Sequence, residues 1–562
     1  MIKSGVASFE RASKRAALAK VVSGFSRSAA VLSERARFAE KRGEWTSLRS
    51  RLITSLSRPV GTDYFRKRHS QLFASPVQSR EARPISNGPP RALDTAFRSG
   101  ENLAMRSLIS ILLAVLASFA AAADKPNFVV IFVDDLGYGD LGCYGHPSIR
   151  TPSLDRMAAE GMRFTDFYVA AEVCTPSRAA LLTGRYPVRS GMAHNQFRVL
   201  RRESTGHLPH DEITIPELLK TKGYATCAVG KWHLGNWMNN PAGHPHKHGF
   251  DSYFGIPHSN DMNRNPGGPK GEDNSTNPDQ KWWNAPLFDE ESLVEQPADQ
   301  TTLTRRYTEQ AVTFIREKKD KPFFLYFPHS FPHTPLFASD KFRDKSPRGR
   351  YGDVVEELDW SVGQILETLR SEGLDKNTFV FFTSDNGPWL IRGLAGGTAG
   401  LLRDGKGSTW EGGMRVPGIA WWPGRIPAGK VCHEVATTMD LMPAIAKFAG
   451  VEMPKDRDFD GVDIAPLLTG TGPVKREVFC YYRGTELFAA RLGKYKAHFF
   501  TQTGYGQPKP DPHDPPLLFD LDADPGESFE CGANHADVIA EIKAAVEKHK
   551  SAVKPAESQL LK

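Results

Sequence analysis

The sequence has few cysteines, and no two of them stand at the spacing of a metal-binding knuckle. Six cysteines occur in 562 residues, and they form no Cys-x-x-Cys motif. Their wide spacing excludes a zinc knuckle and a dense disulfide framework as the basis of the fold. No internal repeat period is evident either, and the length of the chain favours two domains over one.

An apolar run long enough to anchor the chain in a membrane is also missing. The apolar stretch at 108–123 has sixteen residues and ends in small ones, whereas a spanning helix needs about 20. Arg106 precedes it, and an Ala-x-Ala cleavage site lies near Ala123. Residues 105–123 are therefore interpreted as a secretory signal peptide. We expect export to the periplasm or the medium, with no stable membrane insertion after cleavage.

The body of the chain lacks an excess of positive charge. The net charge is +7, but residues 1–104 hold 20 Lys and Arg against 8 Asp and Glu, which leaves −5 on the remaining 458 residues. This distribution argues against nucleic acid as a partner. Because residues 1–104 precede the signal peptide, our hypothesis is that they come from a start codon assigned too far upstream. An amino-terminal transit segment or basic arm is the alternative.

What the chain does contain is a set of short apolar runs that end in polar residues. Continuous apolar runs of this length are typical of strands buried on both faces of a mostly parallel sheet. The four runs cover residues 127–133, 224–230, 322–327 and 378–384. They lead to Asp134 and Asp135, to Lys231 and His233, to His333, and to Asp385 and Asn386. Open α/β sheets bind ligands at the carboxyl ends of their strands, so these groups are predicted to form one site.

Two of these strand ends carry ligands for a hard cation. Asp134, Asp135, Asp385 and Asn386 offer only oxygen atoms, which favours Ca²⁺, with Mg²⁺ possible, over zinc. A strand-end turn could also hold the two adjacent aspartates. The sequence favours metal because paired buried acids are costly without a cation.

A cysteine stands at the predicted start of a helix in Glu172-Val-Cys-Thr-Pro-Ser-Arg. Thr175 is predicted to cap this helix, Pro176 to occupy its first position and Gly184 to end it. The helix dipole and Arg178 would then attract an anion beside Cys174. A buried structural cysteine is the alternative for this pattern alone.

The rest of the chain divides into two predicted domains, 124–455 and 456–562. Helical patterns at 153–161, 304–319 and 354–369 alternate with the apolar runs. Beyond residue 451 the pattern changes to alternating strands, followed by a closing helix near 537–550. The second domain is therefore predicted to be a small α+β unit with an antiparallel sheet.

Residues 235–297 form a long loop-like segment rich in Asn, Pro, Gly, His and Trp. His244, His246 and His248 could suggest a transition-metal site, but no thiol or carboxylate cluster completes it. We interpret the segment as one that shapes a substrate pocket. It also contains Ser259 and a glycosylation sequon at Asn274.

The string Cys174-Thr-Pro-Ser-Arg, followed by Leu-Thr-Gly-Arg, resembles the signature of the formylglycine-dependent sulfatases. Lys-Trp-His-Leu-Gly, Asp-Asn-Gly-Pro and Glu-Gly-Gly follow in the family's order, and the resemblance covers most of residues 125–535. It is to the branch that includes arylsulfatase A and N-acetylgalactosamine-6-sulfatase. The resemblance implies an alkaline-phosphatase-like fold with a large α/β domain and a small C-terminal sheet domain.

The resemblance also implies roles for the candidate residues. A formylglycine-generating enzyme would oxidise Cys174 to formylglycine (3-oxoalanine), whose hydrate attacks the sulfur of a sulfated small molecule or glycan. His233 would remove a proton afterwards, and His333 would protonate the leaving alcohol. The other implied contacts to substrate come from Arg178, Lys231, Ser259 and Lys406.

The chain departs from that family branch at two places. Asp404 stands where arylsulfatase A has a disulfide cysteine, and the segment 236–300 diverges. The substrate therefore does not carry over with the site residues. Two alternatives remain open: a phosphomonoesterase or phosphonate hydrolase of the same superfamily, and an inactive protein that binds sulfated glycans because Cys174 is unmodified.

Overall fold

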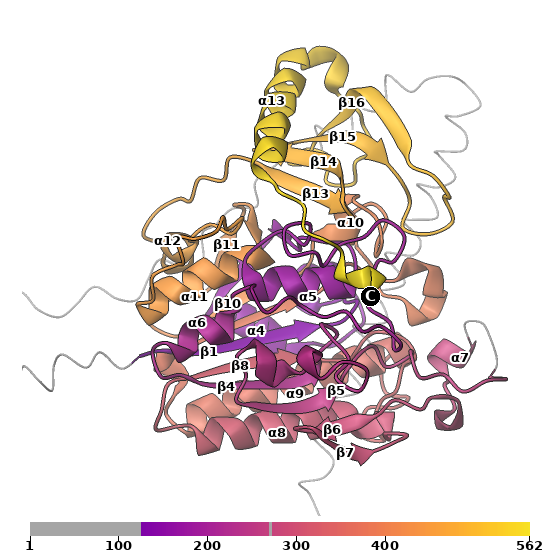
Figure 1. The fold of residues 1–562 in the computed structure, drawn as a ribbon, viewed down its shortest axis with the longest axis vertical. Helices are drawn as coiled ribbons and strands as arrows, with labels where there is room; N and C mark the ends of the chain where they lie inside the picture. The colour runs from indigo at the N-terminus through magenta and orange to yellow at the C-terminus, as the bar shows by residue number, and fades with distance from the viewer. Residues whose placement is uncertain (1–124, 269–272) are drawn as a thin grey trace, which may run out of the picture. The chain divides into compact units, whose positions relative to one another are not determined.

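The computed structural model describes residues 125–268 and 273–562 (Figure 1). The leader predicted at 1–104 and the signal peptide predicted at 105–123 lie outside these residues. The described residues all belong to one compact unit, so the two sheets described below can be placed relative to one another. None of the helices in the described part of the chain combines the length and apolar character that a membrane crossing requires.

A ten-stranded sheet forms the centre of the molecule, in the order β11-β2-β10-β9-β1-β8-β4-β5-β6-β7. Strands β9, β1, β8, β4 and β5 are parallel neighbours, while β10, β6 and β7 run antiparallel to theirs. The predicted mostly parallel α/β sheet is confirmed. The strands are β1 (Asn127–Val133), β2 (Met162–Phe164), β4 (Ala225–Lys231), β5 (Ser252–Ile256), β6 (Leu287–Asp289), β7 (Ser292–Glu295), β8 (Phe323–Pro328), β9 (Thr378–Ser384), β10 (Gly418–Trp421) and β11 (Lys430–Cys432).

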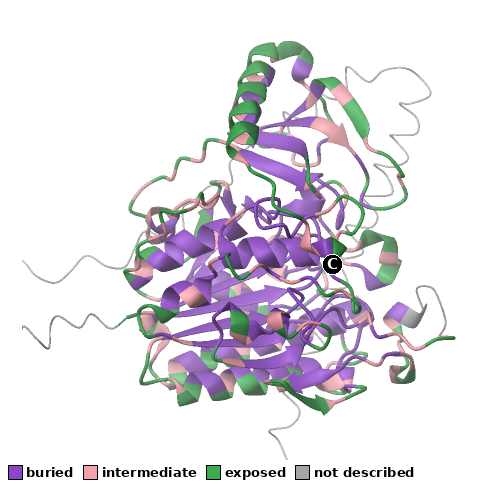
Figure 2. Cartoon of the chain, viewed as in Figure 1, coloured by how far each residue is buried: buried purple, intermediate pink, exposed green. Residues whose placement is uncertain are grey.

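The central strands are apolar throughout because both faces of the sheet are covered. Along β1, Phe128, Val130 and Phe132 enter one core, and the alternate residues Val129 and Ile131 enter the other. Figure 2 shows the strands buried and the covering helices exposed only on their outer sides. One face is covered by α4 (Pro152–Glu160), α8 (Leu303–Glu317) and α9 (Arg350–Ser371), and the other by α5 (Cys174–Thr183), α6 (Ile215–Lys220) and α11 (Leu441–Ala449).

The C-terminal part forms a second sheet, as predicted. Four antiparallel strands follow in chain order, and α13 (Ala536–Ala552) packs on them. The strands are β13 (Phe479–Arg483), β14 (Glu486–Leu492), β15 (Tyr495–Thr501) and β16 (Asp511–Asp520). Smaller elements are β3 (Phe167–Tyr168), which pairs with β12 (Ala436–Thr437), and the short helices α7 (Asp273–Thr276), α10 (Glu411–Met414) and α12 (Ala465–Thr469).

Two predictions of local structure were wrong. The segment 235–297 contains β5, β6 and β7, because pairing with β4 stabilises β5 where its own short sequence gives no clear periodicity. Helix α5 begins at Cys174, so Thr175 does not cap it, and Pro176 is its third residue rather than its first. The Thr175 hydroxyl instead donates to the His233 carbonyl oxygen, at 3.1 Å, and accepts from the Leu200 N–H.

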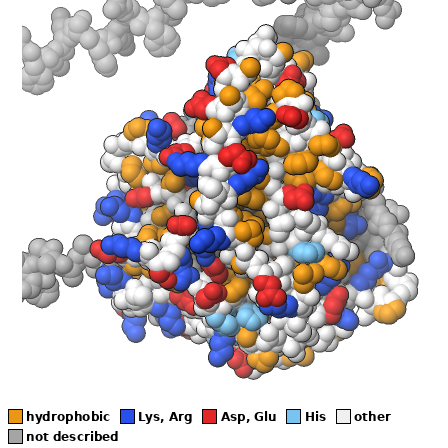
Figure 3. All heavy atoms as spheres, turned by 45° about the horizontal axis from the view of Figure 1, so that its top comes forward, with side chains coloured by type: hydrophobic (Ala, Val, Ile, Leu, Met, Phe, Trp, Pro, Cys, Tyr) orange, Lys and Arg blue, Asp and Glu red, His pale blue; other side chains and the backbone are white. Residues whose placement is uncertain are grey.

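Charged side chains of both signs are interspersed on the face drawn in Figure 3. This mixture is in keeping with the small negative charge counted for the chain after residue 104. A single-sign surface, as nucleic-acid binding would require, is not seen on this face.

Candidate active site

Four neighbouring parallel strands end at one edge of the large sheet, and their ends carry the predicted site residues. Strands β9, β1, β8 and β4 lie side by side in this order. Asp385 follows β9, Asp134 follows β1 and Lys231 is the last residue of β4, while His333 lies in the loop after β8. The pattern of apolar runs with polar ends therefore predicted which side chains meet.

Three aspartates and one asparagine form a buried oxygen-rich cluster. The Asp135 N–H donates to Asp385 Oδ1 at 3.2 Å, and Asn386 Nδ2 donates to Asp135 Oδ1 at 2.7 Å. Asn386 Oδ1 is buried and has no partner among the described residues. An unpartnered buried oxygen beside three carboxylates (Asp134, Asp135 and Asp385) fits the donor set of a hard divalent cation.

Three cationic side chains surround this cluster. Arg178 donates to Asp385 Oδ2 at 2.7 Å, and Lys406 Nζ lies 2.7 Å from Asp135 Oδ1. Lys231 Nζ pairs with Asp134. Burial alone would raise the pKa of Asp134, but the charges of Lys231, His333, Arg178 and Lys406 outweigh it and hold that pKa well below the usual range.

Cys174 lies between the carboxylates and Lys406. Its Sγ is 3.4 Å from Asp134 Oδ1 and 3.6 Å from Lys406 Nζ. Burial raises the pKa of the Cys174 thiol, and the charges of Asp134 and Asp385 raise it further. A thiolate is therefore disfavoured here, so the unmodified cysteine is a poor nucleophile.

Two buried histidines face the site, and their hydrogen bonds show which ring nitrogen carries the proton. His233 Nε2 lies 2.9 Å from the Leu200 carbonyl oxygen, and its buried Nδ1 has no partner among the described residues. His333 Nδ1 lies 2.6 Å from the Thr334 carbonyl oxygen, and its Nε2 is 3.7 Å from Asp135 Oδ2. Since a carbonyl only accepts, the bonded nitrogen carries the proton in each ring. The free nitrogen of each neutral ring holds a lone pair.

Ser259 joins this group from the loop after β5. Its Oγ accepts from Lys231 Nζ at 3.3 Å and lies 3.4 Å from the His333 ring. Asp135 and His233 both have left-handed backbone, with φ of 66° and 59°. Such strain costs on the order of 1–3 kcal/mol and occurs most often at functional sites.

The Asp-Asn-Gly and Glu-Gly-Gly motifs are explained by a close backbone approach. A Cβ atom on Gly387 would lie 1.8 Å from the Gly412 carbonyl oxygen. The Gly387 N–H also donates to the Gly413 carbonyl at 3.0 Å. Only glycine permits this contact, which fixes Asn386 beside the loop that carries Lys406.

A cavity of about 500 Å³ opens above these residues. It is lined by Cys174, His233, Ser259, His333 and Lys406, together with Arg198, Asp261, Trp389 and Tyr505. Sequence reasoning did not single out these last four. Trp389 follows the Asp-Asn-Gly-Pro motif and could have been found there, since its ring contacts Lys406 and His333. Tyr505 comes from the distant loop between β15 and β16, and no sequence signal marks it.

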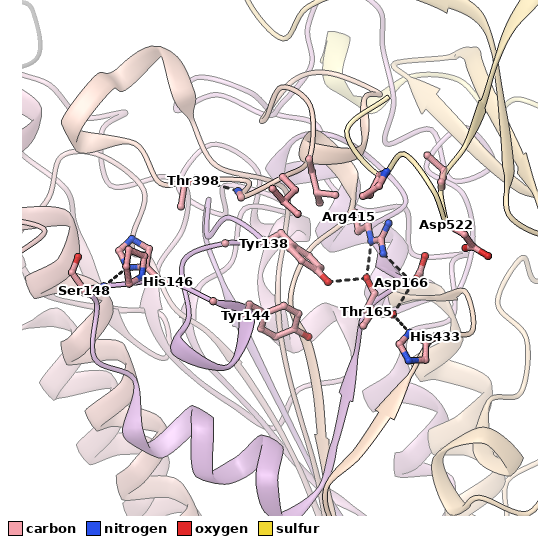
Figure 4. A pocket seen from close by; sticks show the side chains of 18 of the residues that line it. Tyr138, Tyr144, His146, Ser148, Thr165, Asp166, Thr398, Arg415, His433 and Asp522 are labelled. Atoms are coloured by element: carbon pink, nitrogen blue, oxygen red, sulfur yellow. Dashed lines mark hydrogen bonds and ion pairs between the residues drawn. The ribbon is translucent and has the colours of Figure 1, made fainter. Parts of the chain in front are cut away.

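A second cavity is larger, about 1070 Å³, but its buried charged groups, Asp166 and Arg415, are paired with each other (Figure 4). Asp166 is bound by Arg415 at 3.0 Å and by Arg491 at 2.6 Å. The Tyr138 hydroxyl donates to the Thr165 carbonyl oxygen at 3.1 Å. We place the active site in the smaller of the two cavities, because that one has buried polar atoms without partners and residues with left-handed backbone beside it.

The three histidines of the 235–297 segment do not meet at one point. His248 lies with His207 and His210, while His244 and His246 lie with Glu291. The structure thus separates the set that the sequence placed together.

Comparison with known proteins decides the family. The family described as Sulfatase matches residues 126–451, and the C-terminal region of aryl-sulfatase matches residues 474–562. The chain belongs to the sulfatase family. It is accordingly a sulfuric ester hydrolase with an alkaline-phosphatase-like fold.

Relatives of this sulfatase include carbohydrate and aryl sulfatases. It is 41% identical to N-acetylgalactosamine-6-sulfatase of Rattus norvegicus, over 84% of this chain and 93% of that protein. It is 44% identical to arylsulfatase A of Homo sapiens, over 77% of this chain and 89% of that protein. The crystal structure of Ps i-CgsB in complex with k-i-k-neocarrahexaose is similar with a TM-score of 0.66 and 30% identity, over 77% of this chain and 94% of that one.

The rim of the sulfatase pocket is held without a disulfide. All six cysteines lie in the described residues and are free thiols. Asp404, which replaces the cysteine expected from the resemblance, accepts a hydrogen bond from the Gly504 N–H at 3.0 Å. Tyr505, next to Gly504, lines the pocket, so this bond joins the Lys406 loop to the second sheet.

Proposed function

We propose that this chain is an exported sulfatase that hydrolyses sulfate monoesters of a carbohydrate or an aryl alcohol through a formylglycine at position 174. The observation that carries the proposal is the position of Cys174, which lies within 4.8 Å of ligand atoms of Asp134, Asp135 and His333. A nucleophile at this point has carboxylates and cations on one side and a cavity on the other.

The nucleophile is proposed to arise by oxidation of Cys174 by a formylglycine-generating enzyme. Support comes from the burial of the thiol and the nearby carboxylates, which make a thiolate unfavourable. When formed, the hydrated aldehyde would supply one hydroxyl to attack sulfur and a second through which sulfate is released.

A hard cation, Ca²⁺ or Mg²⁺, is proposed to be held by Asp134, Asp135, Asp385 and Asn386. The three carboxylates and the three cations Arg178, Lys231 and Lys406 balance in formal charge, so a bound divalent ion leaves the site positive. That positive charge would stabilise the negative charge that develops on the sulfate oxygens in the transition state. Arg178 is buried against Asp385 and Asp134, so we assign it the positioning of these carboxylates.

Proton transfer is assigned to the two histidines. The unpartnered Nδ1 of His233 would accept a proton as sulfate leaves, because its Nε2–H is fixed on the Leu200 carbonyl. His333 and Lys406 would donate to the leaving alcohol. Because the Nδ1–H of His333 is held by the Thr334 carbonyl, His333 would do so from Nε2 after taking up a proton there from solvent. Ser259 orients Lys231 and His333, since its Oγ contacts both.

The substrate is proposed to be a sulfated glycan or a small aryl sulfate that enters the 500 Å³ cavity. The names of the relatives support the carbohydrate class, while the diverged segment 236–300 leaves the particular sugar open. Export through residues 105–123 and the division of the chain at residue 455 belong to the same proposal.

The test is release of inorganic sulfate from an aryl sulfate by the protein made in its natural host, with Ca²⁺ present. The expected result is turnover, together with a tryptic peptide 164–178 in which Cys174 has lost its sulfur and reacts as an aldehyde. Cys174→Ala is the matched control and should be inactive. Phosphate release from an aryl phosphate without sulfate release would support the phosphomonoesterase alternative. An intact thiol with saturable glycan binding and no turnover would support the binding protein.

A further inference from the structure

Three histidines from two loops meet outside the active site. His207 and His210 lie in the loop before α6, and His248 ends a 3₁₀ turn, Pro245–His248. One ligand-capable ring nitrogen of each lies within 4.8 Å of the others. The rings of His210 and His248 are stacked, with centroids 5.0 Å apart and planes 3° from parallel.

The hydrogen bonds of the two outer histidines leave a lone pair on each. His207 Nδ1 lies 2.8 Å from the Leu208 carbonyl oxygen, and His210 Nδ1 lies 3.3 Å from the Lys247 carbonyl oxygen. Because a carbonyl only accepts, Nδ1 carries the proton, and Nε2 of each neutral ring holds the lone pair. A backbone carbonyl on the far nitrogen is the usual support of a metal-binding histidine.

The inner histidine is buried without a good hydrogen-bond partner. His248 has no exposed surface, and within residues 125–268 and 273–562 neither ring nitrogen makes a hydrogen bond of good geometry, the Ala242 backbone being its one weak contact. A buried polar group without a good partner destabilises the folded protein. Such a group beside two lone-pair nitrogens indicates a ligand that accepts electron pairs.

We propose that His207, His210 and His248 together bind one zinc-class transition-metal ion, with the exposed His210 ring turning out of its parallel stack on His248 so that both lone pairs reach the ion. Imidazole nitrogens suit Zn²⁺, Cu²⁺ and Ni²⁺, and three of them leave a fourth position of a tetrahedral site for water. None of the three ligands is a carboxylate, so this site selects against the hard cation proposed for the active site.

The site lies behind the segment that carries two active-site residues. The His248 ring packs on Trp232, with centroids 5.6 Å apart, and Trp232 stands between Lys231 and His233. Trp232 Nε1 also donates to the Gly243 carbonyl at 2.9 Å. A metal at this place would tie the loop of His207 and His210 to the loop that ends in His248. We infer a structural role, which stiffens the support of His233.

The neighbouring cluster of His244, His246 and Glu291 provides the control. His246 Nε2 is bound to Glu290 Oε2 at 2.6 Å, and His244 Nδ1 accepts from the His246 N–H at 3.2 Å. These nitrogens are engaged within the protein, so this cluster is the weaker ligand set.

The test is Co²⁺ titration of the tag-free full-length protein in excess Ca²⁺, followed by the visible absorption of tetrahedral Co²⁺. We expect one Co²⁺ per chain, displaced by Zn²⁺. His210→Ala and His207→Ala should each lower the affinity at least about 100-fold, because each ligand contributes several kcal/mol. His246→Ala should leave the affinity within about twofold.

Thermal unfolding gives a second readout on the same variants. Zn²⁺ should raise the Tm of the wild type and of His246→Ala, but not that of His210→Ala, whose exposed side chain can be removed without loss of the fold. The proposal is overturned if the wild type binds neither ion, if both single-ligand variants keep the affinity, or if His246→Ala alone loses it. None of these results depends on sulfatase turnover.

Discussion

Lys406 of one buried charge cluster and Glu411 of another lie only a few residues apart in the sequence, and the two clusters differ in whether their carboxylate and amide oxygens are satisfied. The first is the active-site cluster, which includes Lys406. The second lies between the two sheets and is centred on Glu411 and Glu527. Each carboxylate oxygen of these two glutamates has a partner, the partners being Tyr168, Arg415, Tyr481, Lys496, His498 and the Glu411 N–H. In this second cluster the ring nitrogen His498 Nδ1 has no partner among the described residues.

The active-site cluster is different because two of its buried polar atoms have no hydrogen-bond partner. Asn386 Oδ1 and His233 Nδ1 are buried without partners among the described residues. A satisfied buried network specifies a fold, whereas an unsatisfied one is costly and is kept only where it binds something. The difference indicates that the inter-sheet cluster is structural and that the other awaits an ion and a substrate.

Removal of one carboxylate from the active site should give the largest effect, on rate. Asp135→Asn keeps the shape and tolerates the positive φ, but it removes a charge from the proposed cation site. We expect kcat to fall at least about 10³-fold, since several kcal/mol of transition-state stabilisation are lost. Sulfate release from an aryl sulfate measures this loss.

The stability of Asp135→Asn should change much less than its rate. Loss of the Lys406 partner is offset because a buried charge is removed. Burial, and then repulsion from Asp134, raise the pKa of Asp135. Urea unfolding with chelator in both samples removes any difference due to bound metal. A large loss of stability with little loss of kcat would mean that this cluster stabilises the fold, as the inter-sheet cluster does, and does not serve the reaction.

Glu411→Gln is expected to lose stability while keeping its rate, which is the opposite of Asp135→Asn. Lys496 is fully buried between Glu411 and Glu527, at 2.9 Å from each, so the variant leaves it one carboxylate instead of two and leaves the cluster with one positive charge in excess. Breaking such a buried pair costs about 3–5 kcal/mol, while kcat per folded molecule should stay near that of the wild type. Urea unfolding measures the cost. The exposed pair of Lys548 and Glu477 is the matched control, and Glu477→Gln should leave the midpoint unchanged.

The two clusters also differ in how far the sequence predicted them. The active site was accessible because its residues follow apolar strands, and parallel strands end at the same edge, as Asp134 and Asp385 do. Glu411 and Glu527 follow no such runs. Apart from Arg415, four residues after Glu411, their side-chain partners come from β3, β13 and β15 through tertiary contacts. Tyr505 in the pocket, strand β5 and the contact of His207 with His248 also depend on tertiary contacts, so the sequence did not predict them. Thr175 was misjudged because its hydroxyl bonds to distant backbone groups rather than to its own helix.

Acid should weaken the inter-sheet cluster in a defined direction. Burial alone would raise the pKa of Glu411, but Lys496, Arg415 and Arg491 outweigh it and lower that pKa to about 2. The unfolded chain, with a pKa near 4.3, takes up this proton first, so the stabilisation is full above about pH 5 and is lost as pH falls toward 2. Urea midpoints at several pH values should therefore show the advantage of the wild type over Glu411→Gln shrinking with acid. A constant advantage down to pH 3 would mean that this carboxylate is not held ionised.

The smallest effect is expected at Asp404, where the loop that carries Lys406 contacts the loop between β15 and β16 of the second sheet. Its Oδ2 accepts from the Gly504 N–H at 3.0 Å and its Oδ1 from the adjacent Gly405 N–H at 2.8 Å. Because its φ is 60°, Asp404→Gly removes both bonds, of which only the first joins two loops, while glycine tolerates the backbone. Loss of one such bond costs about 1 kcal/mol. Because the bond positions the pocket wall at Tyr505 and touches no reacting group, KM should rise up to about fivefold while kcat stays within about twofold. Steady-state kinetics on an aryl sulfate measures both, with Asp404→Asn, which keeps an acceptor oxygen, as the control. A fall in kcat as large as that of Asp135→Asn would instead place this loop contact within the active-site cluster, through displacement of Lys406.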